Sequence, residues 1–390
     1  MVERMLCCGC HACLEVCPKN AIEWLYDEKG FGFPIVDNEK CVSCGLCERV
    51  CPMDEHRKES NIQKPVMHDV YGAYGLNRDN STSGGIFYYL AKMIINSGGF
   101  VAGVVLDSSM NADHICSNQL QVIEKMRGAK YVQSNMVGIY SEIEGLLREK
   151  KRVLFTGTPC QARALDLYLD SHKTCKDTLI LCDLICHGVG SPHIFQEYIS
   201  LCEKKSKKQI QNHFFRSKCI GWHQEKSCNE FSDGTKDYTS HESQMFLNIY
   251  IDDVTQRESC THCPFASTTR CSDITIGDFW GIEKIKPEFD DNRGVSLVIC
   301  NTVKGKQVFD IIKNDLTVME FSMEDAIRKQ PHLLKPLQYG KKYDQFWKIY
   351  QQCGFEGVAR KMYQYGIQYD LIRSCKNILR PLKKRLKRNS

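Results

Sequence analysis

Long apolar runs are missing from this sequence, and their absence narrows the kinds of protein it can encode. No hydrophobic stretch approaches the roughly 18 residues that a membrane-spanning helix needs. An apolar leader is missing too, because residues 1–6 run directly into Cys7. Hydrophobic residues make up 42% and charged residues 25% of the chain, values typical of globular rather than disordered proteins. We therefore expect a cytoplasmic globular protein.

A strong charge of one sign is absent from most of the chain. The net charge is +5, but residues 376–390 contain seven lysines and arginines and no acid, so the remainder is close to neutral. This distribution predicts no nucleic-acid partner. The basic end could make weak contact with an anionic membrane surface or could be a solvated tail, and both interpretations stay open.

Cysteine, by contrast, is abundant, with 23 residues, an odd number. In a reducing compartment disulfides are disfavoured, so closely spaced thiols there more often bind metal or do redox work. The spacing C-x2-C-x2-C-x3-C-P occurs in residues 7–18 and again in residues 41–52. This is the pattern of bacterial two-cluster ferredoxins, in which the fourth cysteine of each run binds the other cluster.

The two runs predict two [4Fe-4S] clusters. The ligands of cluster I are Cys7, Cys10, Cys13 and Cys51, and those of cluster II are Cys41, Cys44, Cys47 and Cys17. Zinc sites are the alternative, but zinc ligands usually come as two separated pairs. Cys8 falls outside the spacing, and we expect no role for it. Residues 21–24 and 31–36, between the runs, flank a turn and predict a short hairpin.

Composition divides the chain into a ferredoxin domain at 1–55, a polar linker at 56–69, a body at 70–335 and a helical region with a basic tail at 336–390. Strand-like and helical patterns alternate in the body, which favours a sheet covered by helices. The predicted strands lie at 100–106, 152–155, 178–185, 210–216, 273–279, 295–301 and 316–321, and the predicted helices at 86–95, 138–150, 161–169, 191–202 and 304–313. We expect an α+β ferredoxin-like domain followed by a mixed α/β body and a helical tail.

Several stretches of the body together resemble a known family. They are residues 81–85 (STSGG), 127–132 (RGAKYV), 155–161 (FTGTPCQ), 183–188 (DLICHG), the pair Cys260 and Cys263, and residues 273–281 (DITIGDFWG). In this order they are similar to the beta-subunit family of coenzyme F420 (deazaflavin) hydrogenases and dehydrogenases. The resemblance implies that residues 70–335 form a flavin domain, with an N-terminal part at 70–150 and a C-terminal part at 151–335.

The hydroxyl- and glycine-rich turn at 81–85 precedes a predicted helix, where backbone N–H groups could bind a pyrophosphate. A simple helix cap would leave the same pattern. The resemblance favours a flavin, expected to be FAD, with FMN as the alternative. The predicted flavin contacts are Ser81, Thr82, Ser83, Gly84, Gly85, Gly128, Lys130, Tyr131, Thr156, Gly157 and Thr158. For the stretch at 127–132, an ordinary loop is the alternative.

The resemblance also implies a third [4Fe-4S] cluster beside the flavin. Its ligands would be Cys160, Cys186, Cys260 and Cys263, with Cys182 and Cys271 as substitutes. The alternative is that Cys160 and Cys186 are buried small hydrophobes. His187 could donate a proton to a reduced substrate or flavin, and a structural histidine is the competing interpretation.

These predictions combine into a relay between one-electron clusters and a two-electron flavin. The domain order resembles that of bacterial proteins that accompany surface-polysaccharide synthesis. The leading hypothesis is therefore a reductase fed by a donor such as reduced ferredoxin, acting on a small-molecule or sugar-derived acceptor. The alternative is an electron-transfer subunit of a larger redox complex, with no substrate pocket of its own. A structural metal-binding protein would not require so large a body.

Overall fold

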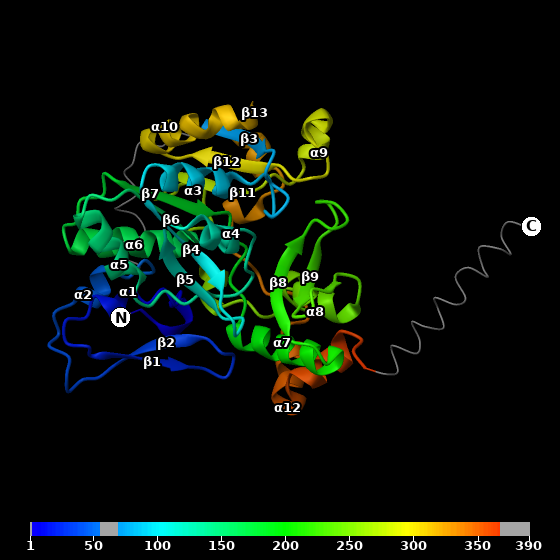
Figure 1. Cartoon of the computed structure of the whole chain (residues 1–390). Helices are drawn as coiled ribbons and strands as arrows, with labels where there is room; N and C mark the ends of the chain where they lie inside the picture. The colour runs from blue at the N-terminus through cyan, green and yellow to red at the C-terminus, as the bar shows by residue number, and fades with distance from the viewer. Residues whose placement is uncertain (1, 55–68, 367–390) are drawn as a thin grey trace, which may run out of the picture.

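The computed structural model describes residues 2–54 and 69–366. Apart from Asp69, the predicted linker lies outside these residues, and so does the basic tail. No helix in the described ranges is both long and apolar enough to cross a bilayer. Figure 1 shows the N-terminal segment, in dark blue, beneath the helices α5 and α6 of the body.

The N-terminal segment, residues 2–54, consists of short elements around the two cysteine runs. The 3-10 helix η1 (Arg4–Leu6) precedes the first run, and the helices α1 (Ala12–Glu15) and α2 (Leu46–Arg49) lie within the runs. The strands β1 (Ile22–Tyr26) and β2 (Gly32–Val36) pair antiparallel. The hairpin predicted between the runs is therefore confirmed.

An eight-stranded mixed sheet forms the centre of the body, in the order β13-β3-β12-β11-β7-β6-β4-β5. Its strands are β3 (Asp69–Gly75), β4 (Phe100–Leu106), β5 (Ala112–Ser117), β6 (Val153–Gly157), β7 (Leu179–Leu184), β11 (Ile274–Asp278), β12 (Ser296–Cys300) and β13 (Leu316–Phe321). The neighbours β4, β6, β7 and β11 run parallel, and the remaining neighbours pair antiparallel. The predicted N-terminal part of the body (70–150) and its C-terminal part (151–335) thus contribute strands to the same sheet.

Most of these strands are predicted by the sequence, and the predicted ranges 100–106 and 316–321 coincide with β4 and β13. The strands β3 and β5 are not anticipated. Glycine and aspartate are depleted in strands, and β3 contains two glycines while β5 contains Asp113. In both cases the partners in the sheet override the weak local preference.

Helices cover both faces of the large sheet (Figure 1). The helices α3 (Ile86–Asn96) and α10 (Val303–Ile312) bury one face, and α5 (Ile139–Arg148) and α6 (Pro159–Ser171) bury the other. On β6, Leu154 and the next residue Phe155 belong to opposite apolar clusters, which explains its continuous hydrophobic sequence. The further helices are α4 (Leu120–Met126), α9 (Ile282–Ile285) and α11 (Met323–Ile327).

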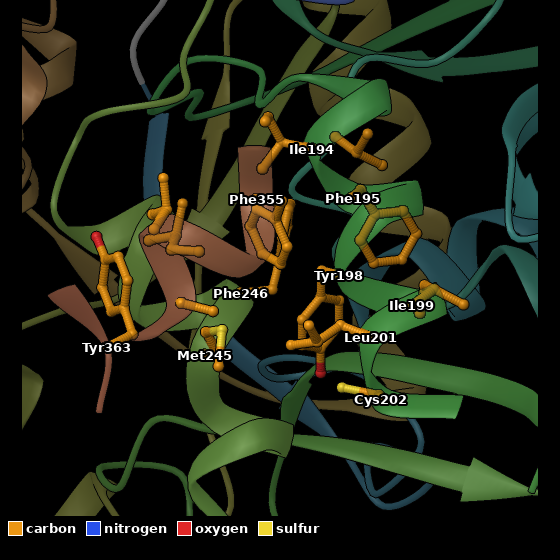
Figure 2. Close-up of a cluster of buried hydrophobic side chains, with 14 of the residues drawn as sticks. Ile194, Phe195, Tyr198, Ile199, Leu201, Cys202, Met245, Phe246, Phe355 and Tyr363 are labelled. Atoms are coloured by element: carbon orange, nitrogen blue, oxygen red, sulfur yellow. The ribbon is translucent and has the colours of Figure 1, made fainter. Parts of the chain in front are cut away.

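A smaller antiparallel sheet has a core of its own. It contains β8 (Ile210–Ser217), β9 (Lys226–Phe231) and β10 (Lys236–Asp237) in the order β10-β9-β8. The helices that contribute to this core are α7 (Pro192–Ser206), α8 (His241–Ile251) and α12 (Tyr343–Met362). Figure 2 shows its side chains, among them Phe195, Tyr198, Phe246 and Phe355. The helix α12 lies in the region expected to be helical.

The N-terminal segment packs on the helical face formed by α5 and α6. The helix α1 contacts both, α2 contacts α6, and η1 contacts the 3-10 helix η3 (Glu258–His262). Ala12, Val16 and Val50 belong to the same buried cluster as residues of α5 and α6. The apolar core of the body therefore continues into the N-terminal segment.

Truncation of Phe246 tests the smaller core. Its fully buried ring lies 4.9 Å from the ring of Phe195. We expect Phe246→Ala to lower the free energy of unfolding by about 3–5 kcal/mol, because the cavity left behind adds to the lost burial. Chemical denaturation under anaerobic conditions measures this change. The control Phe214→Ala removes a ring that is 41% exposed and should change stability by about 0.5 kcal/mol or less. Equal losses in the two variants would contradict the importance of this core.

Candidate functional site

The four predicted ligands of cluster I lie together. Cys7, Cys10, Cys13 and Cys51 line one cavity of about 30 Å³, here called the N-terminal thiol cavity. Burial, reinforced by the neighbouring Cys10, Cys7 and Cys51 thiols, raises the pKa of Cys13. Burial also raises the pKa of Cys51 to about 12. Four mutually interacting thiols around a common space form a suitable donor set for a [4Fe-4S] cluster.

The four predicted ligands of cluster II lie nearer the surface. Cys41 and Cys44 are exposed, whereas Cys17 and Cys47 are partly buried. Backbone N–H groups point at two of these sulfurs. The amide of Ala21 donates to Cys17 Sγ at 3.3 Å, and the amide of Ser43 donates to Cys41 Sγ at 3.5 Å. Hydrogen bonds of this kind stabilise sulfur ligands and tune a cluster's potential.

The four predicted ligands of cluster III also converge, although they are far apart in the sequence. Cys160 comes from the first turn of α6, Cys186 from the loop after β7, and Cys260 and Cys263 from η3 and its end. Together they line a second cavity of about 40 Å³, here called the body thiol cavity. Burial, followed by the other three thiols, raises the pKa of Cys186 well above its ordinary value. Burial likewise raises the pKa of Cys260 to about 12.

The substitute ligands do not reach this cavity. Cys182 is buried in β7 within the apolar cluster beneath α3, and Cys271 belongs to the cluster beneath α5 and α6. Within the described residues, no group of three or more His, Cys, Asp or Glu side chains is arranged to hold a metal ion. In a cubic cluster each iron takes its own thiolate, so the ligands surround a volume instead of converging on one point.

Cys8, for which we expected no role, lies between the two thiol cavities and lines both. Interaction with the neighbouring Cys10 and Cys160 thiols, followed by burial, raises the pKa of Cys8 well above its ordinary value. The interaction with Cys8 lowers the pKa of Cys10, and lowers that of Cys160 to about 7. Nothing in the spacing of the first cysteine run predicts this position.

A third and larger cavity, of about 250 Å³, opens at the carboxyl ends of β6, β7 and β11. All of the predicted flavin contacts except Gly84 line it: Ser81, Thr82, Ser83, Gly85, Gly128, Lys130, Tyr131, Thr156, Gly157 and Thr158. Ligands of open α/β sheets commonly bind at this edge. We call it the large cavity.

The turn at 81–85 forms one end of the large cavity and leads into α3. Gly85 has φ 87°, a left-handed conformation that glycine adopts without strain. Gly84 does not border the cavity, but a Cβ there would lie 2.2 Å from the carbonyl oxygen of Ala73. Its amide donates to Ser296 Oγ at 2.9 Å, so Gly84 shapes the turn from behind.

Two cations that sequence reasoning did not select hold this turn in place. Arg127 is 6% exposed and donates from Nε to Ser81 Oγ at 3.1 Å. Lys218 donates from Nζ to the carbonyl oxygen of Ser83 at 2.7 Å. Arg127 begins the RGAKYV stretch and could have been selected from it, whereas Lys218 lies 135 positions from Ser83, so no local pattern links them.

Lys130 and Tyr131 border the large cavity, and both side chains contact other residues of the protein. Lys130 Nζ donates to carbonyl oxygens of residues 125–128 at 2.9–3.1 Å, which places the ammonium on the C-terminal end of α4. Burial lowers its pKa to about 7, and the carbonyl oxygens oppose this by favouring the charged form. The ring of Tyr131 stacks on Tyr250 at 4.3 Å, nearly parallel.

His187 lies in the wall of the large cavity, with its ring 4.5 Å from that of His332. Burial lowers the pKa of His187 to about 4, so the imidazole is neutral near pH 7. A neutral ring keeps one N–H for hydrogen bonding but does not act as a strong proton donor. The role of His187 as a proton donor stays a prediction.

The large cavity and the body thiol cavity are direct neighbours. They share the residues Thr158, Gln161, Cys186, Gly188 and Val189 in their walls. A group bound in one cavity would therefore lie close to a group bound in the other.

A buried polar network fixes the start of α6 at this shared wall. The amide of Thr158 donates to Gln161 Oε1 at 2.9 Å, and Gln161 Nε2 donates to Ser134 Oγ at 3.0 Å. Ser134 Oγ in turn lies 2.9 Å from His114 Nδ1, and His114 Nε2 lies 3.1 Å from the carbonyl oxygen of Thr156. Because a carbonyl oxygen only accepts, the hydrogen of the neutral ring belongs on Nε2.

This network predicts acid sensitivity. Burial lowers the pKa of His114 from 6.5 to about 4, so below about pH 6.5 the unfolded chain takes up a proton that the folded chain does not. Stability is therefore lost as the pH falls from about 6.5 towards 4. We expect His114→Gln to show a smaller difference in denaturation midpoint between pH 7 and pH 5 than the unsubstituted protein. The more exposed His193, changed to Gln, is the control, and an unaltered pH dependence in His114→Gln would refute the argument.

Comparison with known proteins finds matches for two parts of the chain. Residues 150–325 match the family model that describes the C terminus of the beta subunit of coenzyme F420 hydrogenase/dehydrogenase. Residues 6–54 match the model of the 4Fe-4S dicluster domain. An uncharacterized ferredoxin of Methanocaldococcus jannaschii is 40% identical over 52 residues, which cover 13% of this chain and 66% of the ferredoxin.

Similarity to one relative extends over most of the chain. The F subunit of the F420H2 dehydrogenase of Methanosarcina mazei is 22% identical over 342 residues, covering 82% of this chain and 86% of that protein. A chain in a solved structure of the F420-reducing [NiFe] hydrogenase complex from Methanosarcina barkeri superposes with a TM-score of 0.46 and 15% identity, covering 80% of this chain and 97% of that one. The motifs and the family matches agree: an N-terminal segment that matches the 4Fe-4S dicluster domain precedes a body whose residues 150–325 match the C-terminal model of the beta-subunit family of coenzyme F420 hydrogenases and dehydrogenases.

Proposed function

We propose that this chain is an electron-transfer subunit in which iron–sulfur clusters exchange electrons with a flavin, beside a redox partner. One observation carries the proposal: the three cavities follow one another. The N-terminal and body thiol cavities share Cys8, and the body thiol and large cavities share Cys186. Donor groups for one-electron centres therefore lead to a cavity of a size and lining that suit a flavin.

The cysteines would hold three [4Fe-4S] clusters. The two runs of the N-terminal segment would hold clusters I and II, and Cys160, Cys186, Cys260 and Cys263 would hold cluster III. Such clusters supply one-electron transfer at potentials set by burial and by hydrogen bonds to sulfur. The protein would position the thiols and limit the access of water to the clusters, which affects their redox potentials.

FAD is the flavin we assign to the large cavity. The turn at 81–85 and the first turn of α3 would bind its phosphates, because a helix N-terminus carries unpaired N–H groups and partial positive charge. Apolar side chains such as Val104 and Ile276, with the Tyr131 ring, suit a flat aromatic ring system. A flavin supplies the exchange between one-electron and two-electron carriers.

A subunit role is favoured over a self-contained reductase. The relative that covers most of the chain is named as one subunit of a dehydrogenase. The exposed Cys41 and Cys44 offer a partner protein access to the second N-terminal site. A reductase would instead turn over a small-molecule or sugar-derived acceptor with reduced ferredoxin as donor. Sustained turnover of such an acceptor by the isolated chain would decide for the reductase.

Iron content tests the cluster assignment. The anaerobically purified protein should contain about twelve iron atoms per chain, and Cys263→Ala about eight, because one cubic cluster is lost. Cys271→Ala is the matched control, since this buried thiol lies outside the body thiol cavity and should keep about twelve. Eight iron atoms in the unsubstituted protein would remove cluster III from the proposal.

Flavin release tests the large cavity. The amide of Ala129 donates to Thr82 Oγ1 at 2.8 Å, a contact that joins the turn to the opposite wall. We expect Thr82→Ala to weaken flavin binding about tenfold, as the loss of roughly one hydrogen bond would. Fluorescence of released flavin measures the affinity, and Thr317→Ala, on the outer strand β13, is the control. Absence of flavin even after reconstitution would contradict the assignment.

A further inference from the structure

A buried cation lies in the wall of the body thiol cavity. Arg270 is 5% exposed and lines this cavity together with its four cysteines. A guanidinium keeps its charge throughout the pH range in which proteins are folded. Because burial removes water from this charge, negative or polar groups nearby must offset the cost of desolvation.

A buried carboxylate is one of the groups that offset this charge. Asp183 of β7 is fully buried, and its Oδ2 lies 3.5 Å from Nη1 of Arg270. Its other oxygen accepts from Thr275 Oγ1 at 2.6 Å. Close charge-assisted hydrogen bonds measure about 2.7–2.9 Å, so this ion pair is loose. Part of the guanidinium charge is therefore available to other groups in the cavity.

The ion pair also joins two segments that carry predicted ligands. Asp183 stands three residues before Cys186, at the end of β7. After Cys263 the chain turns back, since the amide of Ala266 donates to the carbonyl oxygen of Cys263 at 3.4 Å. Arg270 Nε donates to the carbonyl oxygen of Ser267 at 2.8 Å, which holds its side chain beside this turn. Arg270 is thus held in the cavity wall from both segments.

Another buried arginine near the cysteines has different surroundings. Arg257, only 1% exposed, donates from Nε to the carbonyl oxygen of Cys7 at 2.5 Å and from one terminal nitrogen to that of Gly32 at 2.8 Å. Its other terminal nitrogen donates to Gln133 Oε1 at 2.9 Å. Arg257 borders neither thiol cavity. Its contacts hold backbone in place, whereas Arg270 presents its charge at the wall of a cavity.

We propose that Arg270 sets the redox potential of the [4Fe-4S] centre in the body: its guanidinium, in the wall of the body thiol cavity, stabilises the reduced state, and Asp183 limits this effect. The inference rests on the proposed function and deepens it by naming the charge that regulates one centre of the relay. On reduction the centre gains one electron, and the neighbouring cluster or flavin that supplies it is oxidised by one electron. No covalent bond forms or breaks, and Arg270 keeps its proton.

The direction of the effect follows from charge. A cluster held by four thiolates is an anion, and reduction adds one more negative charge. A cation beside the cluster therefore attracts the reduced state more strongly than the oxidised state, which raises the potential. The attraction is large because the site is buried and poorly screened. A higher potential at this centre favours its reduction by cluster I.

Potentiometric titration followed by electron paramagnetic resonance tests the role of Arg270. In Arg270→Gln the reduction equilibrium of cluster III should become about tenfold less favourable, which lowers its potential by about 59 mV. Asp183→Asn removes the opposing charge and should raise the potential, while Arg270→Lys keeps the cation and should retain most of the original value. Loss of a signal in Cys263→Ala identifies cluster III. The control is Arg78→Gln, because Arg78 is also buried and paired with an aspartate, Asp291, but borders neither thiol cavity.

The iron content of the same samples separates this inference from the proposed function. With about twelve iron atoms per chain, an unchanged potential in Arg270→Gln, or shifts in the same direction in Arg270→Gln and Asp183→Asn, overturns the role of Arg270 while the clusters of the proposed function stand. If Arg270→Gln does not hold cluster III, Asp183→Asn decides: a raised potential supports the role, and any other result overturns it. About eight iron atoms and no third signal in the unsubstituted protein overturn cluster III, and the inference falls with it.

Discussion

The buried guanidinium of Arg257 is the contact that positions the first cysteine run against the body. Its donors reach the first cysteine run at Cys7, the hairpin at Gly32 and the body at Gln133. A planar group with several fixed donors can satisfy three acceptors at once, which a lysine could not do in the same space. Because the charge is buried, each of those acceptors is needed to offset its desolvation. The position of the loop at residues 7–10 is thereby narrowly defined.

The large sheet positions the body thiol cavity and the large cavity. The parallel strands β6, β7 and β11 end at one edge, where the first turn of α6 carries Cys160 and the loop after β7 carries Cys186. These same segments contribute Thr158 and Gly188 to the wall that the body thiol cavity shares with the large cavity. The chemistry is thus placed on short connections between rigid elements, where small errors in backbone position are limited.

Local patterns in the sequence predict the parts of this site that are local. The spacing of the cysteine runs is sufficient to predict the ligand sets of clusters I and II, and the turn at 81–85 indicates the start of α3. The positions of Cys8, Arg257 and Lys218 could not be predicted, because each acts through contacts with residues more than a hundred positions away in the chain or across a packed interface. The missed strands β3 and β5 have the same cause, since tertiary pairing outweighs their weak local preference.

The N-terminal segment is too small to stabilise itself by apolar burial alone, since domains of its size bury a smaller share of their surface than large ones. Three of its buried residues, Ala12, Val16 and Val50, join the cluster formed by α5 and α6. Tyr140 of α5 adds a hydrogen bond from its hydroxyl to the carbonyl oxygen of Cys10, at 2.6 Å. The apolar contacts that complete the fold of the segment also hold the first cysteine run next to Cys160.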